Sequence, residues 1–134
     1  MEISVFYEDT DCGGVVYYAN YLKYFERGRT ELLEQAQFPP SRLMEEGFVF
    51  TVVHCEIFYR SPAKYRDSLH VETLLTEATR TVLTFTYRIL EKKCQRLIVN
   101  GTTKLVSVGL NGKIKRLPQE MVERLANIVT PPKD

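Results

Sequence analysis

The residues with the clearest chemical potential lie in an acidic, glycine-bearing turn near the start of the chain. Asp11 is followed closely by Gly13 and Gly14, and residues 15–17 then lead into an amphipathic segment. Because Val, Val and Tyr offer no side-chain acceptor for a helix start, the first helical N–H groups are expected to be unfilled. Such groups carry about half a positive charge, and glycine lets another molecule approach the backbone closely. We therefore predict a seat for a negatively charged oxygen at this point.

Asp11 is expected to lie within reach of this predicted seat. A carboxylate beside an oxyanion-binding site is suited to acyl-transfer chemistry. The alternative is that Asp9, Thr10 and Asp11 only form a turn, since short polar side chains bond their own backbone in such loops. The spacing of the residues is compatible with both interpretations.

The amphipathic segment predicts a helix of about 20 residues, roughly 30 Å long, which is enough to cover one face of a small sheet. On a helical wheel, its apolar arc contains Tyr18, Tyr21, Leu22, Phe25, Gly28, Leu32, Leu33 and Ala36. Arg29 also falls within this arc, with Glu26 one turn earlier. Because a buried arginine needs a partner, we predict a structural Glu26–Arg29 ion pair, with a catalytic role for Glu26 as the alternative.

Most of the remaining chain is predicted to form a β-sheet. Alternating apolar residues predict strands at residues 2–7, 48–60, 69–77, 80–91 and 96–108. Residues 42–47 predict a short link after the prolines that end the long helix, and residues 118–127 a closing helix before a loose tail at 130–134. This order predicts an α+β fold in which a long central helix packs in a curved antiparallel sheet of about five strands.

Length and composition limit the classes of function. A chain of 134 residues with 44% hydrophobic residues supports one domain, residues 1–134. The net charge of +1 gives no overall attraction to nucleic acid or anionic membranes. No apolar run approaches the roughly 18 residues of a membrane span, and the N-terminal residues lack the pattern of a secretory signal, so we expect a cytoplasmic protein.

The chemistry that the sequence lacks narrows the interpretation further. Cys12, Cys55 and Cys94 are odd in number and widely spaced, so we predict neither a disulfide framework nor a metal site. His54 and His70 fall on predicted strands, which argues against a Ser-His-Asp triad. One carboxylate plus backbone donors must therefore suffice, and no cofactor is predicted. A thioester suits this equipment because its carbonyl is electrophilic and its thiolate leaves without a strong proton donor.

Several runs of the sequence carry a resemblance to a known family. They are YEDTDCGGVVYYANY at residues 7–21, FERGRTE at 25–31, residues 59–67 and GKIKRLP at 112–118. The chain resembles the 4-hydroxybenzoyl-CoA thioesterase family of hotdog-fold proteins, and its nearest branch is the Tol-Pal-associated acyl-CoA thioesterases. The resemblance implies a hotdog fold and hydrolysis of acyl-CoA to free acid and coenzyme A.

The resemblance also implies roles for particular residues. Asp11 matches the catalytic carboxylate, as nucleophile or as general base, and the backbone N–H of Tyr18 matches the donor that polarises the thioester carbonyl. Tyr18 stands where the Tol-Pal branch commonly has His, and here the chain resembles the 4-hydroxybenzoyl branch. The predicted substrate-binding residues are Tyr7, Gly14, Val16, Tyr17, Tyr59, Arg60 and Lys64. Arg66 and Arg80 are further candidates for binding the coenzyme A phosphates.

The family resemblance further implies a homodimer or homotetramer in which subunits join their sheets and complete each other's sites. Two other functions remain open from the sequence. One is a hydratase of the same fold, which normally needs a histidine near the aspartate. The other is a non-catalytic partner of acyl carrier protein or of an envelope complex.

Overall fold

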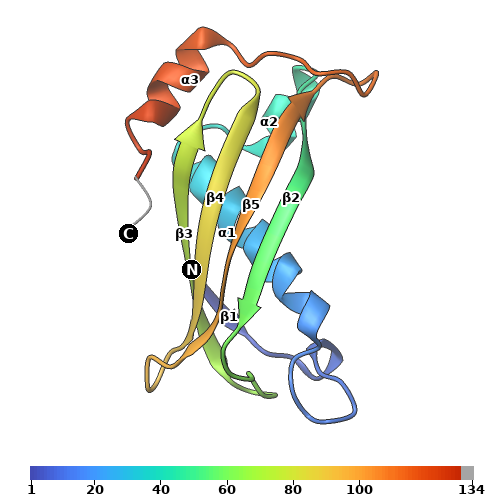
Figure 1. The fold of residues 1–134 in the computed structure, drawn as a ribbon, viewed down its shortest axis with the longest axis vertical. Helices are drawn as coiled ribbons and strands as arrows, with labels where there is room; N and C mark the ends of the chain where they lie inside the picture. The colour runs from blue at the N-terminus through green and yellow to red at the C-terminus, as the bar shows by residue number, and fades with distance from the viewer. Residues whose placement is uncertain (131–134) are drawn as a thin grey trace.

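A five-stranded antiparallel sheet curves around one long helix in the computed structural model, which describes residues 1–130 (Figure 1). The strand order is β1-β3-β4-β5-β2, and β1 and β2 form the two edges. The strands are β1 (Glu2–Ser4), β2 (Val49–Tyr59), β3 (Ser68–Ala78), β4 (Val82–Glu91) and β5 (Leu97–Val108). The helices are α1 (Tyr21–Gln35), α2 (Pro40–Glu45) and α3 (Gln119–Ala126). The predicted α+β arrangement, with a long helix in a curved sheet, is confirmed.

Helix α1 packs unusually close to the sheet. Phe25 is fully buried and stacks on Tyr87 of β4, with ring centroids 4.1 Å apart. Gly28 lies over β3, where a Cβ atom would collide with the Thr73 hydroxyl and crowd Val71. A residue without a side chain is therefore needed at this crossing.

The start of the chain differs from its predicted form. Strand β1 ends at Ser4, and Tyr7–Asp9 forms a 3-10 turn instead of continuing the strand. The turn forms because the Asp9 carboxylate accepts the Phe6 N–H at 2.9 Å, a local bond that competes with the sheet. Tyr7 is consequently 76% exposed and does not share a buried face with Ile3 and Val5.

The long helix is shorter than predicted and begins differently. Helix α1 has 15 residues, and Tyr18–Asn20 before it form a 3-10 turn. At the other end, Gln37 adopts a left-handed conformation with φ 69°, and the Phe38 N–H bonds the Leu33 carbonyl at 2.8 Å. This closes the helix just before Pro39, as the sequence predicts.

The predicted Glu26–Arg29 ion pair is wrong. Glu26 is exposed and Arg29 half-buried, and no ion pair joins them among the described residues. The helical wheel placed the apolar arc too far toward Leu22, which is 41% exposed, and missed Tyr24, which is fully buried. The helix is thus rotated on the sheet relative to the predicted arc, which leaves Arg29 at its margin.

Candidate active site

The loop that contains Asp11 is a short antiparallel excursion held at its base. Thr10 pairs with Val16, and the Asp11 N–H bonds the Val15 carbonyl at 2.9 Å. The Val16 N–H bonds the Ala63 carbonyl at 2.8 Å, which anchors the loop to the segment between β2 and β3. The loop lies at one end of the sheet, beside the start of α1 (Figure 1). Its position is therefore fixed by backbone bonds on both sides.

The Asp11 side chain is exposed and only partly engaged. One carboxylate oxygen accepts the Gly13 N–H at 2.8 Å, so the turn-forming interpretation is correct for that oxygen. Within residues 1–130 the other oxygen has no hydrogen-bond donor, and it remains available to a substrate or a water molecule. Gly14 has φ +80° and open space where a side chain would be, so the loop allows close approach from outside.

The opening turn of the helix also keeps a free donor. The Tyr17 N–H bonds the Asp9 carbonyl at 2.9 Å, and the Asn20 N–H bonds the Tyr17 carbonyl at 2.8 Å. Between them, the Tyr18 N–H has no acceptor among the described residues, and neither Tyr17 nor Asn20 caps the turn with its side chain. The unfilled N–H predicted from the sequence is therefore present, one residue from the bond that ties the turn to the acidic loop.

Five tyrosines form a continuous cluster from this turn into the core. Successive ring centroids lie 4.8 Å apart for Tyr17 and Tyr18, 6.3 Å for Tyr18 and Tyr59, 5.9 Å for Tyr59 and Tyr21, and 6.0 Å for Tyr21 and Tyr24. We call these residues the tyrosine cluster. Its outer members are exposed and its inner members buried, so it forms one aromatic wall beside the free N–H of Tyr18.

Four hydroxyls of the tyrosine cluster have a raised pKa. Burial raises the pKa of Tyr21, Tyr24 and Tyr59 above the ordinary value for tyrosine. The hydrogen-bonding Tyr18 hydroxyl raises the pKa of Tyr17 in the same direction. With a raised pKa, these four hydroxyls keep their protons at neutral pH and act as neutral donors or acceptors.

Of the remaining predicted site residues, some lie at the Asp11 loop and others are buried or lie elsewhere. Lys64 pairs with Val15 beside the Asp11 loop, and Tyr7 starts the loop with its ring against Tyr65 at 5.8 Å. Val16, in contrast, is 4% exposed and belongs to the core, so its side chain does not face a substrate. Its buried place follows from its role in anchoring the base of the loop.

Two predicted basic residues lie away from the Asp11 loop. The Arg60 side chain bonds the Asn100 side chain at 2.9 Å and covers the Phe58 ring, on the strand face opposite to Tyr59. Arg80 follows β3 at the other end of the sheet and donates to the Leu117 carbonyl at 3.0 Å. Arg80 is therefore not part of this site, because the strand length separates the two ends of the sheet (Figure 1).

Sequence reasoning missed two polar residues behind the Tyr18 turn. Asn20 is 8% exposed and Tyr24 fully buried. The Asn20 side-chain nitrogen and the Tyr24 hydroxyl have no hydrogen-bond partner among the described residues. An Asn at the start of a helix is a signal for a cap, but here the side chain turns inward, which only the packing of α1 reveals.

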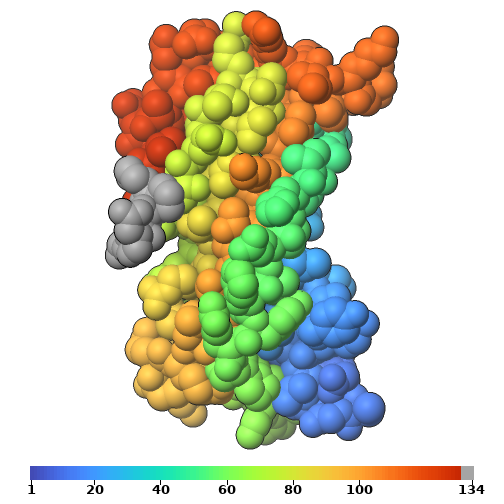
Figure 2. Space-filling model, in the orientation of Figure 1, coloured from blue at the N-terminus to red at the C-terminus, as the bar shows by residue number. Residues whose placement is uncertain are grey.

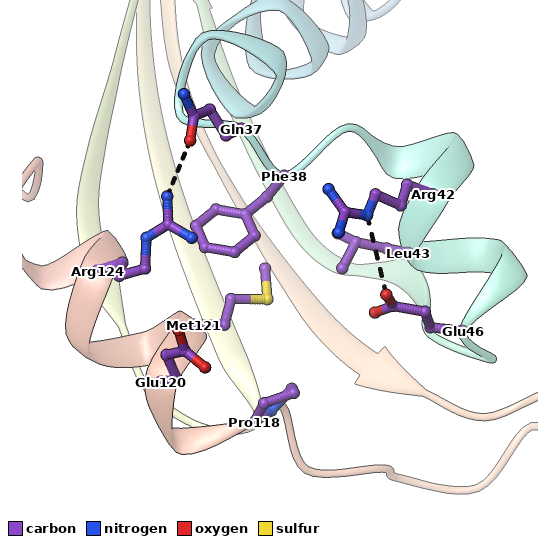
Figure 3. Close-up of a pocket in the computed structure, with 9 residues that line it drawn as sticks. All are labelled: Gln37, Phe38, Arg42, Leu43, Glu46, Pro118, Glu120, Met121 and Arg124. Atoms are coloured by element: carbon purple, nitrogen blue, oxygen red, sulfur yellow. Dashed lines mark hydrogen bonds and ion pairs between the residues drawn. The ribbon is translucent and has the colours of Figure 1, made fainter.

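A separate cavity of about 220 Å³ lies between the end of α1, α2 and α3 (Figure 3). Its guanidinium groups are already engaged. Arg124 donates to the Gln37 side chain at 3.1 Å and covers the Phe38 ring, and Arg42 pairs with Glu46 at 3.9 Å. This cavity lies at the other end of the sheet from the Asp11 loop, so we treat it as separate from the candidate active site (Figure 1).

Residues 1–130 contain neither a metal-binding cluster nor a membrane-spanning helix. No group of three His, Cys, Asp or Glu side chains there is arranged to hold a metal ion. None of the helices in that range is both long enough and apolar enough to cross a membrane. The three cysteines are free, and all three are exposed in the chain.

Known proteins similar in sequence to this chain include acyl-CoA thioesterases. The chain is 38% identical over 121 residues to the acyl-CoA thioester hydrolase YbgC of Escherichia coli O6:H1, covering 90% of each chain. It is 40% identical over 114 residues to the acyl-CoA thioesterase YbgC of Haemophilus influenzae, covering 84% of this chain and 82% of that protein.

The fold is likewise shared with solved structures. The 1,4-dihydroxy-2-naphthoyl-CoA thioesterase Slr0204 of Synechocystis superposes with a TM-score of 0.85 at 25% identity, covering 98% of this chain and 97% of that one. The hotdog fold implied by the resemblance is thereby confirmed. A model of the thioesterase-like superfamily matches residues 5–125, nearly the whole chain, and the protein therefore belongs to this superfamily.

Proposed function

We propose that the protein is an acyl-CoA thioesterase that hydrolyses acyl-CoA thioesters to a free acid and coenzyme A. The observation that carries the proposal is that two groups lie on adjoining backbone turns: an Asp11 carboxylate oxygen without a donor and a Tyr18 N–H without an acceptor, both within residues 1–130. The similarity to acyl-CoA thioester hydrolases supports the same activity.

The proposed chemistry uses these two groups in sequence. The Tyr18 N–H binds the thioester carbonyl oxygen and stabilises the negative charge that develops on it. As a general base, Asp11 takes a proton from water while the water oxygen bonds to the carbonyl carbon, and the C–S bond then breaks to release the thiolate. As a nucleophile, Asp11 bonds to the carbonyl carbon itself, and water hydrolyses the resulting anhydride after the thiolate has left.

The test is a substrate screen on the purified protein. Short-chain, long-chain and aryl CoA esters are incubated with the chain, and the free acid and coenzyme A are separated and quantified. We expect equimolar release of both products from at least one class. Acid quenching followed by mass measurement of the Asp11 peptide distinguishes the two routes, because only the nucleophilic route leaves an acyl adduct. Absence of turnover across all classes would overturn the proposal.

The surroundings of the loop suggest how the substrate is held. Lys64, next to Val15, is positioned to meet the coenzyme A phosphates, and the exposed Tyr7 and Tyr17 flank the loop. The tyrosine cluster offers an aromatic wall for the acyl group. We assign no phosphate contact to Arg60, since its guanidinium is engaged with Asn100 on the other strand face.

We further propose that the working unit is a homodimer, or a homotetramer built from two dimers, in the cytoplasm. Among the described residues, strand β2 pairs with β5 on one side only. It also carries four exposed apolar side chains, those of Val52, Val53, Phe58 and Tyr59. Figure 2 shows β2 lying along the surface, with the N-terminal loop region beside its lower end. An uncovered edge of this length is a surface for strand pairing with a second copy. Three exposed free thiols suit a reducing compartment.

A further inference from the structure

A hydrogen bond joins the last residue of the edge strand to the opening turn of α1. The Tyr59 hydroxyl donates to the Tyr18 carbonyl at 3.0 Å, across 41 positions of sequence. This side chain therefore contacts the backbone of the same residue whose N–H has no acceptor among the described residues. Tyr59 is set apart by this bond from the other exposed tyrosines near the loop.

The contact completes a set of restraints around Tyr18. The peptide before it is held by the Asn20 N–H, which bonds the Tyr17 carbonyl at 2.8 Å. The peptide after it carries the carbonyl that Tyr59 binds. Both flanking peptide planes are thus fixed, while the Tyr18 N–H itself has no acceptor among residues 1–130. Preorganised donors of this kind contribute most to rate because they need no reorientation during the reaction.

Packing fixes the direction of the Tyr59 hydroxyl. Its ring lies between those of Tyr18 and Tyr21, at centroid distances of 6.3 and 5.9 Å. Partial burial raises the pKa of Tyr59, so the hydroxyl keeps its proton and remains a donor above the ordinary tyrosine range.

We infer that Tyr59 is a positioning residue, which holds the opening turn of α1 so that the Tyr18 N–H is aimed at the thioester carbonyl. The inference rests on the proposed function. It gives Tyr59 a role that differs from lining the substrate pocket, because the effect passes through the Tyr18 backbone. Loss of the hydroxyl should therefore weaken stabilisation of the transition state and leave binding of the ground state unchanged.

The test compares Tyr59→Phe with wild type on the best substrate of the screen. We expect kcat to fall about 3- to 10-fold, the loss of one hydrogen bond, with KM and the pH profile of kcat/KM unchanged. The matched control is Tyr65→Phe, which removes a hydroxyl from another exposed tyrosine that makes no hydrogen bond among the described residues. It should retain wild-type kcat. Thermal melting of both variants shows whether they are folded.

Three results would overturn the inference. The first is an unchanged kcat in Tyr59→Phe. The second is a change in KM alone, which would mark Tyr59 as a substrate contact. The third is the loss of one side of the bell-shaped pH profile, which would mark Tyr59 as an acid or base. If Tyr59→Phe fails to fold, Tyr59→His and Tyr59→Leu are compared, and equal kcat values count against the inference because only histidine offers a ring N–H donor. An inactive wild type overturns the proposed function, whereas an active wild type matched by Tyr59→Phe overturns this inference alone.

Discussion

The Asp11 carboxylate has two oxygens with different tasks. One accepts the Gly13 N–H and shapes the turn, while the other has no donor among the described residues. Turn formation and catalysis are therefore compatible in one residue, although the sequence presents them as alternatives. The hydrogen bond to Gly13 also limits how far the carboxylate can rotate, which would give the proposed reaction a fixed direction.

Replacing Asp11 by Asn tests the chemical task separately from the structural one. Asparagine keeps a carbonyl oxygen for the Gly13 N–H, so we expect the fold and melting temperature to be retained. The amide is neither a base nor a nucleophile, so kcat should fall at least about 10²-fold. Glu8→Gln, an exposed acidic change three residues away, is the control and should keep full activity. An active Asp11→Asn enzyme would rule out the proposed mechanism.

Glu91 provides a prediction about pH and stability. Its carboxylate accepts the Cys94 N–H and thiol at 2.9 and 3.0 Å and the Lys93 N–H at 3.1 Å. These bonds, led by the Cys94 N–H, lower the pKa of Glu91 from 4.5 to about 2. Because the folded pKa is depressed, the stabilisation is complete above about pH 4.5 and is lost as the pH falls toward 2.

Unfolding measured between pH 2 and 6 checks this assignment. Glu91→Gln should be less stable than wild type near pH 6, and the difference should shrink as the pH falls through that window. Glu45→Gln, an exposed glutamate on α2 without an ion pair among the described residues, is the control and should parallel wild type. A constant difference between Glu91→Gln and wild type at every pH would contradict the prediction.

At the scale of elements, the long strands were predictable because their side chains alternate, and the closing helix at 118–127 is confirmed as α3, while the short turns near the N-terminus were not predicted. Strands β2 to β5 match the predicted runs closely, since each is fixed by a periodic apolar pattern. The 3-10 turns at residues 7–9 and 18–20 depend on local hydrogen bonds, such as the one that the Phe6 N–H donates to the Asp9 carboxylate, and these leave no periodic signal in the sequence. The inward turn of Asn20 depends on how α1 sits on the sheet, and the wheel misplaced that face.

The crossing of α1 over β3 gives a prediction at this scale. Gly28→Ala places a methyl group against the Thr73 hydroxyl, so we expect a loss of about 1–3 kcal/mol in the free energy of unfolding, as for other overpacked sites. Denaturant titration measures it. Lys23→Ala changes an exposed position of the same helix and should shift stability much less. Equal stability of Gly28→Ala and wild type would mean that the helix can move away from the sheet.

At the scale of the whole molecule, the candidate site joins parts of the chain that are distant in sequence. The Asp11 loop rests on Ala63 and Lys64, and the Tyr18 turn is held by Tyr59. The family resemblance pointed to Asp11, Tyr18 and Tyr59 individually, but no local pattern links Tyr59 to the Tyr18 carbonyl. Such contacts arise only when the sheet has folded around α1. The length of the strands likewise places Arg80 at the end of the sheet away from the site.

The proposed assembly through β2 is tested by placing a charge on its edge. Val53 is 60% exposed, and Val53→Asp should reduce the molar mass measured by size exclusion with light scattering to that of one chain. Activity should fall with it, since each site is proposed to be completed by the partner. Leu110→Asp, a still more exposed apolar position outside β2, should leave the mass unchanged. A wild-type chain that runs as a monomer would refute the proposal directly.

The exposed edge of strand β2 also affects how the protein aggregates. Strand β2 reads VFTVVHCEIFY, with many β-branched and aromatic residues, one carboxylate and no proline. An isolated segment of this composition can template ordered stacking of many chains as well as the joining of two. If the chain assembles through β2 as proposed, subunits that dissociate on dilution or heating are expected to aggregate as fibrils before they unfold. Aggregation, and not denaturation, would then limit how long the protein stays active.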